Sequence, residues 1–316
     1  MRQLFLPSGL ILSVLFSLTL PSAGLFLADN NGLKILVFII FLVSGHQTGR
    51  NALALDRRLG TIFLAAILIS LVLGPLLGLF AGRILNYPFY LAMGLIITGT
   101  VPPTLSSGVV ITEVSGGNTS LALFLTISLN LLGIISIPFI LDLFLKAAGP
   151  VDIDQFSLFI KMFFLVLLPF GTGKMLQMLP GPRKNFPFLS YINSSCVILI
   201  VYSSLATSRQ AFSGLLFADY MLIVTGVAMV HLPLLLAGFA AGKTLQLKTA
   251  DTKALVFVSS QKTLPIAIAI LASIAIDTGD AIIVCLIFHF FQLFIDSLLA
   301  MAVQRHNNFS LAKKAL

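Results

Sequence analysis

The stretch T-G-T-V-P-P-T-L-S-S-G at residues 98–108 and the stretch S-S-Q-K-T-L-P at residues 259–265 decide the fold of this chain. Each lies inside an apolar run that is long enough to cross a bilayer, and each interrupts that run with proline and a cluster of polar side chains. A helix that opens at membrane depth frees backbone N–H and C=O groups, which are tolerated only where protein or a wet cavity surrounds them. Two interruptions at corresponding places of two halves predict a binding site between the halves.

The composition around these stretches predicts an all-α polytopic membrane protein. Of 316 residues, 58% are hydrophobic and 9% are charged, with a mean hydropathy of +1.06. Soluble domains carry about 25% charged residues, so the bilayer must take up this apolar surface. The basic residues behind the net charge of +8 are scattered over loops and give no nucleic-acid patch. The two cysteines, Cys196 and Cys285, predict neither a disulfide framework nor a metal site.

Ten transmembrane helices are predicted, the fourth and ninth being the broken ones. Their approximate ranges are 9–27, 33–46, 60–83, 88–114, 119–145, 156–177, 189–207, 216–242, 252–276 and 281–303. With both termini cytoplasmic, thirteen of the 19 Lys and Arg residues lie on the inner side, five lie outside, and Lys262 remains at membrane depth. The positive-inside rule therefore favours a multi-pass protein of the plasma membrane (the inner membrane in a bacterium) with cytoplasmic termini.

Weak likenesses between the halves predict a five-plus-five inverted repeat. The third span carries Pro75 and ends in G-R-I-L at 82–85, and the eighth carries Pro233 and ends in G-K-T-L at 242–245. Both broken spans place T-L beside their polar cluster. Helices of opposite orientation that are related in this way are typical of secondary transporters.

Polar side chains at membrane depth are expensive and mark candidate sites. Thr104, Ser106 and Ser107 follow a tandem proline that cannot continue a helix, although a hydroxyl can also bond to its own helical turn. Lys262 in mid-span must pair, face water or lose its charge, and a structural or snorkelling role is its alternative. The residues expected to bind substrate are Thr104, Ser106, Ser107, Gln261, Lys262 and Thr263.

Further ionisable residues suggest ion or proton coupling. His289 and Asp296 lie two helical turns apart and share a face with Gln292, which fits either a proton relay or helix–helix hydrogen bonding. Glu113 is either a solvated carboxylate at the inner end of its span or part of an inward cavity, and His231 is expected to be a packing residue. Motifs of metalloproteases, serine hydrolases and P-loop proteins are absent from the sequence, so an enzyme is not expected.

At P-P-T-L-S-S-G-V-V-I-T-E-V-S-G-G-N (102–118) and S-S-Q-K-T-L-P (259–265) the chain resembles the bile acid:sodium symporter superfamily, in the SBF-like branch that includes the seventh member of solute carrier family 10. The resemblance implies a panel domain, and a core domain in which the broken helices cross beside the substrate. The implied division is 1–58 for panel helices 1–2, 59–147 for core helices 3–5, 148–210 for panel helices 6–7, 211–304 for core helices 8–10 and 305–316 for a cytoplasmic tail.

The resemblance also implies two sodium ions behind the crossover in sodium-coupled members, and here the chain departs from the family. The glutamate shared by both sodium sites falls on Phe257, and the asparagine after the ninth-span glutamine is replaced by Lys262. At about 6 Å and an effective dielectric constant of about 20, an ammonium repels a sodium ion by roughly 2–3 kcal/mol. The residues expected in ion or proton coupling are Thr126, Asn130, Ser260, Gln261, Ser70, Glu113, His289 and Asp296.

These observations predict a secondary active transporter of a small organic anion that works by alternating access, sodium-independent or proton-linked. The alternatives are a sodium-coupled symporter of a bile-acid-like or small carboxylate solute, a non-transporting membrane regulator, and a channel, which is disfavoured because no filter signature is visible. No cofactor is expected, sodium is disfavoured, and lipid is the other partner. The substrate and the oligomeric state are left open.

The first testable prediction concerns orientation. A reporter fused after Leu316 should be cytoplasmic, and a reporter inserted at Ser213 should lie on the opposite side, because the inner loops carry most of the positive charge. Labelling of both sites with a membrane-impermeant thiol reagent measures this. The opposite labelling pattern would overturn the assignment of every loop to its side.

Overall fold

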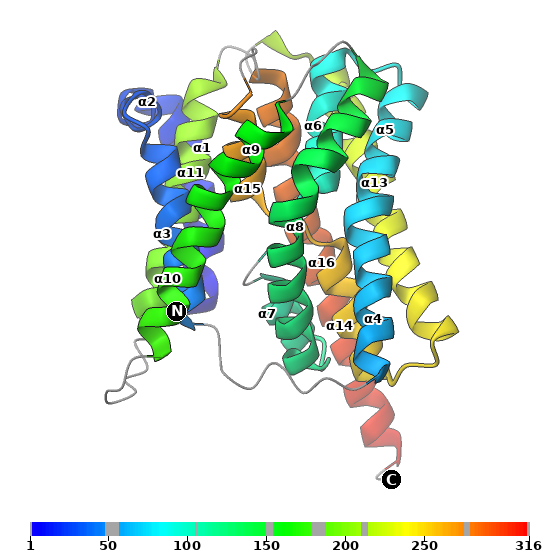
Figure 1. Ribbon diagram of the computed structural model, residues 1–316. Helices are drawn as coiled ribbons and strands as arrows, with labels where there is room; N and C mark the ends of the chain where they lie inside the picture. Colours follow the sequence, from blue (N-terminus) through cyan, green and yellow to red (C-terminus); the bar gives the residue numbers. More distant parts are fainter. Residues whose placement is uncertain are drawn as a thin grey trace.

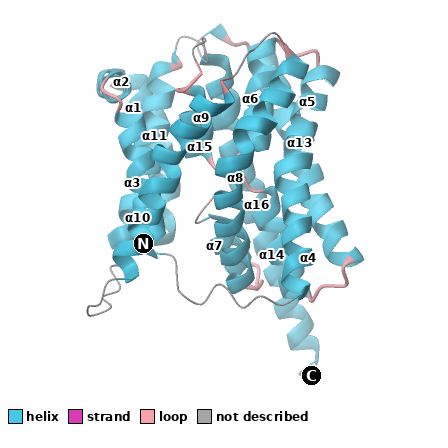
Figure 2. Ribbon diagram, viewed as in Figure 1, coloured by secondary structure: helices cyan, strands magenta, loops and turns pink. Residues whose placement is uncertain are grey.

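The computed structural model describes residues 2–47, 57–104, 107–149, 154–178, 188–209, 214–274 and 279–314. Within these ranges the chain is helical and contains no strand (Figure 2). The elements are α1 (Arg2–Thr19), α2 (Pro21–Asp29), α3 (Gly32–Gln47), α4 (Arg57–Ile67), the π-helical turn η1 (Leu68–Leu73), α5 (Gly74–Ile84), α6 (Phe89–Thr100), α7 (Ser107–Val114), α8 (Thr119–Ala148), α9 (Gln155–Met162), the π-helical turn η2 (Phe163–Leu167), α10 (Leu168–Met178), α11 (Phe188–Thr207), α13 (Phe217–Thr244), α14 (Thr249–Ser260), α15 (Leu264–Leu271) and α16 (Gly279–Lys314).

Six helical stretches of the described chain are long and apolar enough to cross a membrane, or seven if the bent pair α1–α2 is one span. Three shorter apolar helices, Gly32–Gln47, Phe89–Thr100 and Tyr191–Thr207, lie between them. The protein is therefore a multi-pass membrane protein. Each predicted span has a helical counterpart, but the count of ten crossings stays a prediction because several counterparts are short or broken.

The first predicted span, 9–27, is not one straight helix. The chain bends by 96° between α1 and α2, at Pro21. Proline has no N–H for the helical ladder and its ring clashes with the preceding turn, so it ends α1 and occupies the first position of α2. The expectation of an uninterrupted first helix was wrong because it overlooked this residue.

The helices pack as two groups that lie side by side (Figure 1). In the smaller group, α11 contacts α1, α2 and α3, α10 contacts α3, and α9 continues through η2 into α10. In the larger group, α4–α8 contact α13, α14 and α16, and α15 contacts α16 on one side and α3 of the smaller group on the other. Figure 1 shows α6 and α15 in the upper half of the molecule and α7 and α14 in the lower half, so the two interrupted helices run in opposite directions.

The two halves of the larger group share local backbone geometry. After α5 the N–H of Tyr87 donates to the carbonyl of Gly82 at 2.8 Å, and after α13 the N–H of Leu247 donates to the carbonyl of Gly242 at 2.9 Å. Asn86 and Gln246 both adopt a φ of 51° in these turns. The helices that follow, α6 and α14, both have 12 residues and both end in extended backbone with ψ of 148°.

A row of glycines lets α5 lie against α6 with backbones in contact. A Cβ atom at Gly74 would lie 2.2 Å from the carbonyl oxygen of Gly99, and one at Gly78 would lie 2.7 Å from the carbonyl oxygen of Leu95. Small residues four apart are the usual means of close helix packing in membranes, where apolar side chains gain little by leaving lipid. This packing fixes α6, and with it the first helix break.

The second prediction tests this contact. Gly78→Ala should destabilise the protein by about 1–3 kcal/mol, because the new methyl group meets backbone atoms that cannot turn away. Unfolding can be followed with a thiol-reactive dye, since Cys196 and Cys285 are both buried and free. Gly60→Ala on α4 is the matched control: nothing lies within 4 Å of its Cβ position, so stability should be kept or raised. Equal melting curves for both variants would contradict the packing argument.

Candidate functional site

The two helix interruptions lie where the sequence predicts them. The helix α6 ends at Thr100 and α7 begins at Ser107, with Pro102 and Pro103 in extended chain between them. The second break spans residues 261–263, and Pro265 lies in the first turn of α15. Since α7 and α15 both begin at a break, the positive ends of two helix dipoles point toward the middle of the protein.

The two breaks touch, and neighbouring helices satisfy the backbone groups that they free. The N–H of Thr263 donates to the carbonyl of Pro102 at 3.0 Å. Asn130 on α8 donates its amide to the carbonyl of Pro103 at 2.9 Å. Gln292 on α16 accepts from the backbone N–H of Lys262 at 2.8 Å and donates to the carbonyl of the same residue at 2.7 Å. The unwound segments are therefore held by protein on both sides.

Three of the predicted substrate residues form one polar cluster. The Oε1 atom of Gln261 accepts from Thr104 Oγ1 at 3.0 Å and from Ser107 Oγ at 2.6 Å. The Thr104 and Ser107 hydroxyls lie close to each other, so they converge on the same acceptor. Gln261 is fully buried and Thr104 is 7% exposed, while Ser107 is half-buried. Thr263 joins through its backbone, and Ser106 lies outside the described residues.

Lys262 has different partners from the rest of the cluster. Its side chain is 1% exposed, and its ammonium donates to oxygens of Ser70, Gly99 and Val101 at 2.5–3.2 Å. Ser70 lies in the π-helical turn η1, a kind of local distortion that is frequent at functional sites. In this conformation the ammonium therefore bonds to protein oxygens from η1 and from the end of α6.

A buried carboxylate continues the polar cluster on its other side. Asp296 on α16 has no exposed surface; its Oδ2 accepts from Gln261 Nε2 at 2.6 Å, and its Oδ1 lies 2.8 Å from His231 Nε2. His231 was expected to be a packing residue, and its contact with Asp296 is a role that sequence reasoning missed. The available signal was an ionisable residue in mid-span on α13. His289 contacts Gln292 at 3.2 Å instead of Asp296.

The remaining coupling residues divide between buried and exposed positions. Thr126 and Asn130 lie one turn apart on α8, and Thr126 Oγ1 and Asn130 Oδ1 are buried without a hydrogen-bond partner. Ser260 donates to the carbonyl of Phe257 at 3.3 Å, within its own helix. Glu113 is exposed on α7. Among the described residues, no group of three His, Cys, Asp or Glu could hold a metal ion.

Phe257 lies at the position where the family resemblance implies a glutamate. Its ring is 4% exposed and belongs to an apolar cluster with Ile111, Leu235 and Ala300. An aromatic ring packed among aliphatic groups offers no oxygen to a hard cation. This position therefore contributes packing between α7, α13, α14 and α16.

The G-G-N element at 116–118 has a structural explanation. Gly116 adopts a φ of 71°, and a Cβ atom at Gly117 would lie 2.6 Å from Thr112. Asn118 caps α8 by accepting from the N–H of Leu121 at 3.1 Å, and its amide donates to Asp251 at 2.7 Å. The element turns the chain sharply from α7 into α8 and ties this turn to the start of α14.

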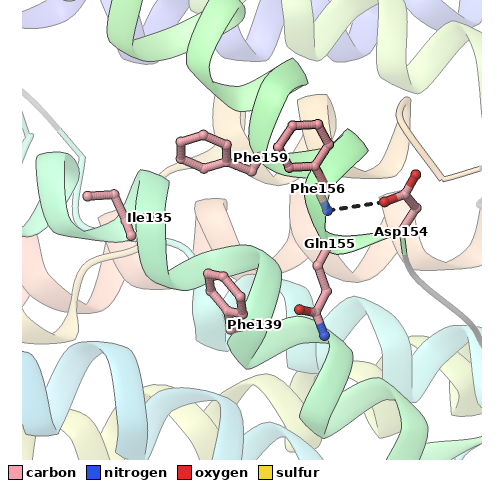
Figure 3. Close-up of a pocket in the computed structure, with 6 residues that line it drawn as sticks. All are labelled: Ile135, Phe139, Asp154, Gln155, Phe156 and Phe159. Atoms are coloured by element: carbon pink, nitrogen blue, oxygen red, sulfur yellow. Dashed lines mark hydrogen bonds between the residues drawn. The ribbon is translucent and has the colours of Figure 1, made fainter.

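A pocket of about 590 Å³ lies between α8 and α9, at a boundary between the two helix groups (Figure 3). It is lined by Ile135, Phe139, Asp154, Gln155, Phe156 and Phe159. None of the crossover residues lines this pocket. Its large apolar side chains are open to the outside, with Phe156 72% and Phe139 56% exposed. We interpret it as a lipid-facing groove.

Comparison with known proteins agrees with this architecture. The family model of the SBF-like CPA transporter family matches residues 4–305. The chain is 29% identical over 310 residues to a probable chloroplastic sodium/metabolite cotransporter, BASS4, of Arabidopsis thaliana, covering 93% of this chain and 71% of the relative. It is 30% identical over 188 residues to sodium/bile acid cotransporter 7 of Mus musculus, covering 58% of this chain and 54% of the relative.

The family match covers nearly the whole chain and includes both helix breaks, and the relatives are transporters rather than enzymes. This confirms the family that the motifs at 102–118 and 259–265 indicate. The chain belongs to the SBF-like CPA transporter family.

Proposed function

We propose that this membrane transporter is a secondary active transporter that moves a small organic anion by alternating access, coupled to protons. The observation that carries the proposal is the crossover itself: the hydrogen bond between Thr263 and Pro102, with Thr104, Ser107 and Gln261 converging beside it. Hydroxyl and amide groups can donate to a carboxylate, and the positive ends of α7 and α15 favour a negative ligand.

The matching turns and breaks of the two halves support a five-plus-five inverted repeat with ten crossings. The paired geometry at Gly82 and Gly242, and at Val101 and Gln261, comes from helices that run in opposite directions (Figure 1). In such a repeat, both ends of the chain lie on one side, here the cytoplasmic side of the plasma membrane. The smaller helix group would be the panel and the larger group the core that moves against it.

Charge neutrality inside the core supports proton coupling. Asp296 and Lys262 are an acidic and a basic side chain, and both are buried beside the crossover. An entering anion adds a negative charge that is costly in a low-dielectric interior. A proton on the His231–Asp296 pair restores the balance, and Gln261 connects this pair to Thr104 and Ser107.

Few other ionisable side chains of the described residues lie on the elements around the His231–Asp296 pair. Lys262 lies in the neighbouring break, His289 lies on the same helix as Asp296, and Glu113 on the adjacent α7 is exposed. His231 and Asp296 contact each other directly, at 2.8 Å. We therefore propose that the proton binds to this pair.

Sodium-coupled symport is the second candidate. The names of the relatives in Arabidopsis and mouse include sodium, and the unpartnered oxygens of Thr126 and Asn130 are hard ligands of the kind that sodium prefers. A non-transporting membrane regulator, the remaining alternative, would require coupling neither to protons nor to sodium.

The third prediction separates these functions. Purified protein in proteoliposomes should accumulate small carboxylates saturably, with uptake raised by an inward proton gradient and unchanged when choline replaces sodium. Gln261→Leu should lower uptake by about tenfold or more, because it removes the acceptor shared by the Thr104 and Ser107 hydroxyls and the donor to Asp296. Saturable uptake that needs sodium would favour the second candidate. Failure of a broad panel of carboxylates, including bile acids, to accumulate would contradict anion transport.

The fourth prediction tests the proton site. Asp296→Asn keeps the side-chain volume and can still accept from Gln261 and donate to His231, but it cannot lose its proton. Substrate exchange across the membrane should persist, and the stimulation by a proton gradient should disappear. Asp142→Asn is the control, because this buried carboxylate on α8 pairs with Lys146 outside the crossover. Unchanged proton stimulation in Asp296→Asn would exclude the pair as the coupling site.

A further inference from the structure

The ammonium of Lys262 lies in a shell of oxygen atoms rather than in an ion pair. It is 2.5 Å from the carbonyl oxygen of Ser70, 2.7 Å from that of Gly99, 3.1 Å from Ser70 Oγ and 3.2 Å from the carbonyl oxygen of Val101. An ammonium has three N–H donors, so these four acceptors exceed its hydrogen-bonding capacity. The nitrogen is therefore surrounded by four oxygen atoms, three of which are backbone carbonyls.

The shell consists mainly of backbone carbonyl oxygens that would be hydrogen-bonded within the helix if α6 and η1 were regular and continuous. Gly99 and Val101 belong to the last turn and cap of α6, where carbonyls lack helical partners and the helix dipole is negative. Ser70 supplies both a carbonyl and a hydroxyl from the π-helical turn. Carbonyls at unwound segments and half-helix C-termini are the ligands that broken-helix transporters use for monovalent cations.

The charge of the shell fits a monovalent cation. No carboxylate of the described chain lies within 4.0 Å of the Lys262 ammonium, so the shell itself is neutral. Divalent hard cations usually require carboxylates, whereas uncharged carbonyls can replace the hydration shell of a monovalent ion. A glycine forms one wall: a Cβ atom at Gly74 would lie 3.0 Å from the ammonium.

We propose that this shell is a monovalent-cation site and that Lys262 fills it permanently as a tethered cation. The side chain enters from the second break and its ammonium binds to the end of the first, so a positive charge holds the crossover together without a dissociating ion. The site would then need no sodium in the wild-type protein. Removal of the side chain would open it to a free sodium or ammonium ion. The inference deepens the proposed sodium independence but does not depend on any transported solute.

The test is the ion dependence of thermal stability of the full chain in detergent, read with a thiol-reactive dye on the buried cysteines. Lys262→Ala should melt lower than wild type. Sodium chloride or ammonium chloride should recover it by roughly 2–4 °C or more, and choline chloride at the same ionic strength should not. Lys262→Met is the matched control: it also removes the charge but fills the space with an apolar chain, so no salt should recover it.

The assay uses no substrate, so a failure of carboxylate uptake leaves it unaffected. Folded Lys262→Ala protein that responds equally to sodium, ammonium and choline would overturn the proposal. If Lys262→Ala does not fold, the wild-type protein is measured instead. Its melting temperature should be the same in sodium chloride and in choline chloride. If sodium raises the melting temperature of the wild type, and Ser70→Ala removes this effect, a metal ion occupies the shell together with Lys262 and the proposal is overturned.

Discussion

At the middle of a bilayer, every backbone polar group must find a partner within the protein, and this constraint organises the whole crossover. The prolines open α6, and the freed carbonyls of Pro102 and Pro103 are taken by Thr263 and Asn130. Gln292 satisfies both backbone groups of Lys262. The polar residues of α8 and α16 are thus needed to hold the breaks open, before any role in coupling is considered.

The same opening creates places for charge. Carbonyls at the end of α6 receive the Lys262 ammonium, and Gln261 in the second break receives the hydroxyls of the first while donating to Asp296. The basic Lys262 and the acidic Asp296 therefore both bond to the crossover, Lys262 to carbonyl oxygens and Asp296 to the Gln261 amide. A buried charge is stable only with such compensation, so the hydrogen bonds of Lys262 and Asp296 hold the two broken helices in this arrangement.

The sequence predicts the helix breaks well, because tandem proline and clustered polar residues in an apolar run are compatible with few structures. It does not predict the hydrogen-bond partners of the residues at the breaks. Ser70 is among the residues expected in coupling, but its contact with the Lys262 ammonium, like that of Gly99, is made through a backbone carbonyl distant in the sequence, which a side-chain pattern does not predict. For His231 the sequence predicts only a packing role, because a lone histidine in an apolar helix has no visible partner until α13 and α16 are placed together.

The types of contact differ between the crossover and the boundary of the two helix groups, and this difference bears on the proposed motion. The crossover is held by buried hydrogen bonds, which are costly to break without water. At the boundary, α3 meets α15 through aliphatic side chains that share one apolar cluster, including Val37 and Ile266. Hydrogen bonds across the boundary include one from the exposed Lys161 to the carbonyl of Ser273 and one from Gln155 to Asp142 between α9 and α8, both outside this apolar cluster. Apolar surfaces can slide while remaining in contact, because dispersion has no preferred direction. A movement along this seam would therefore carry the crossover and its charges as one unit.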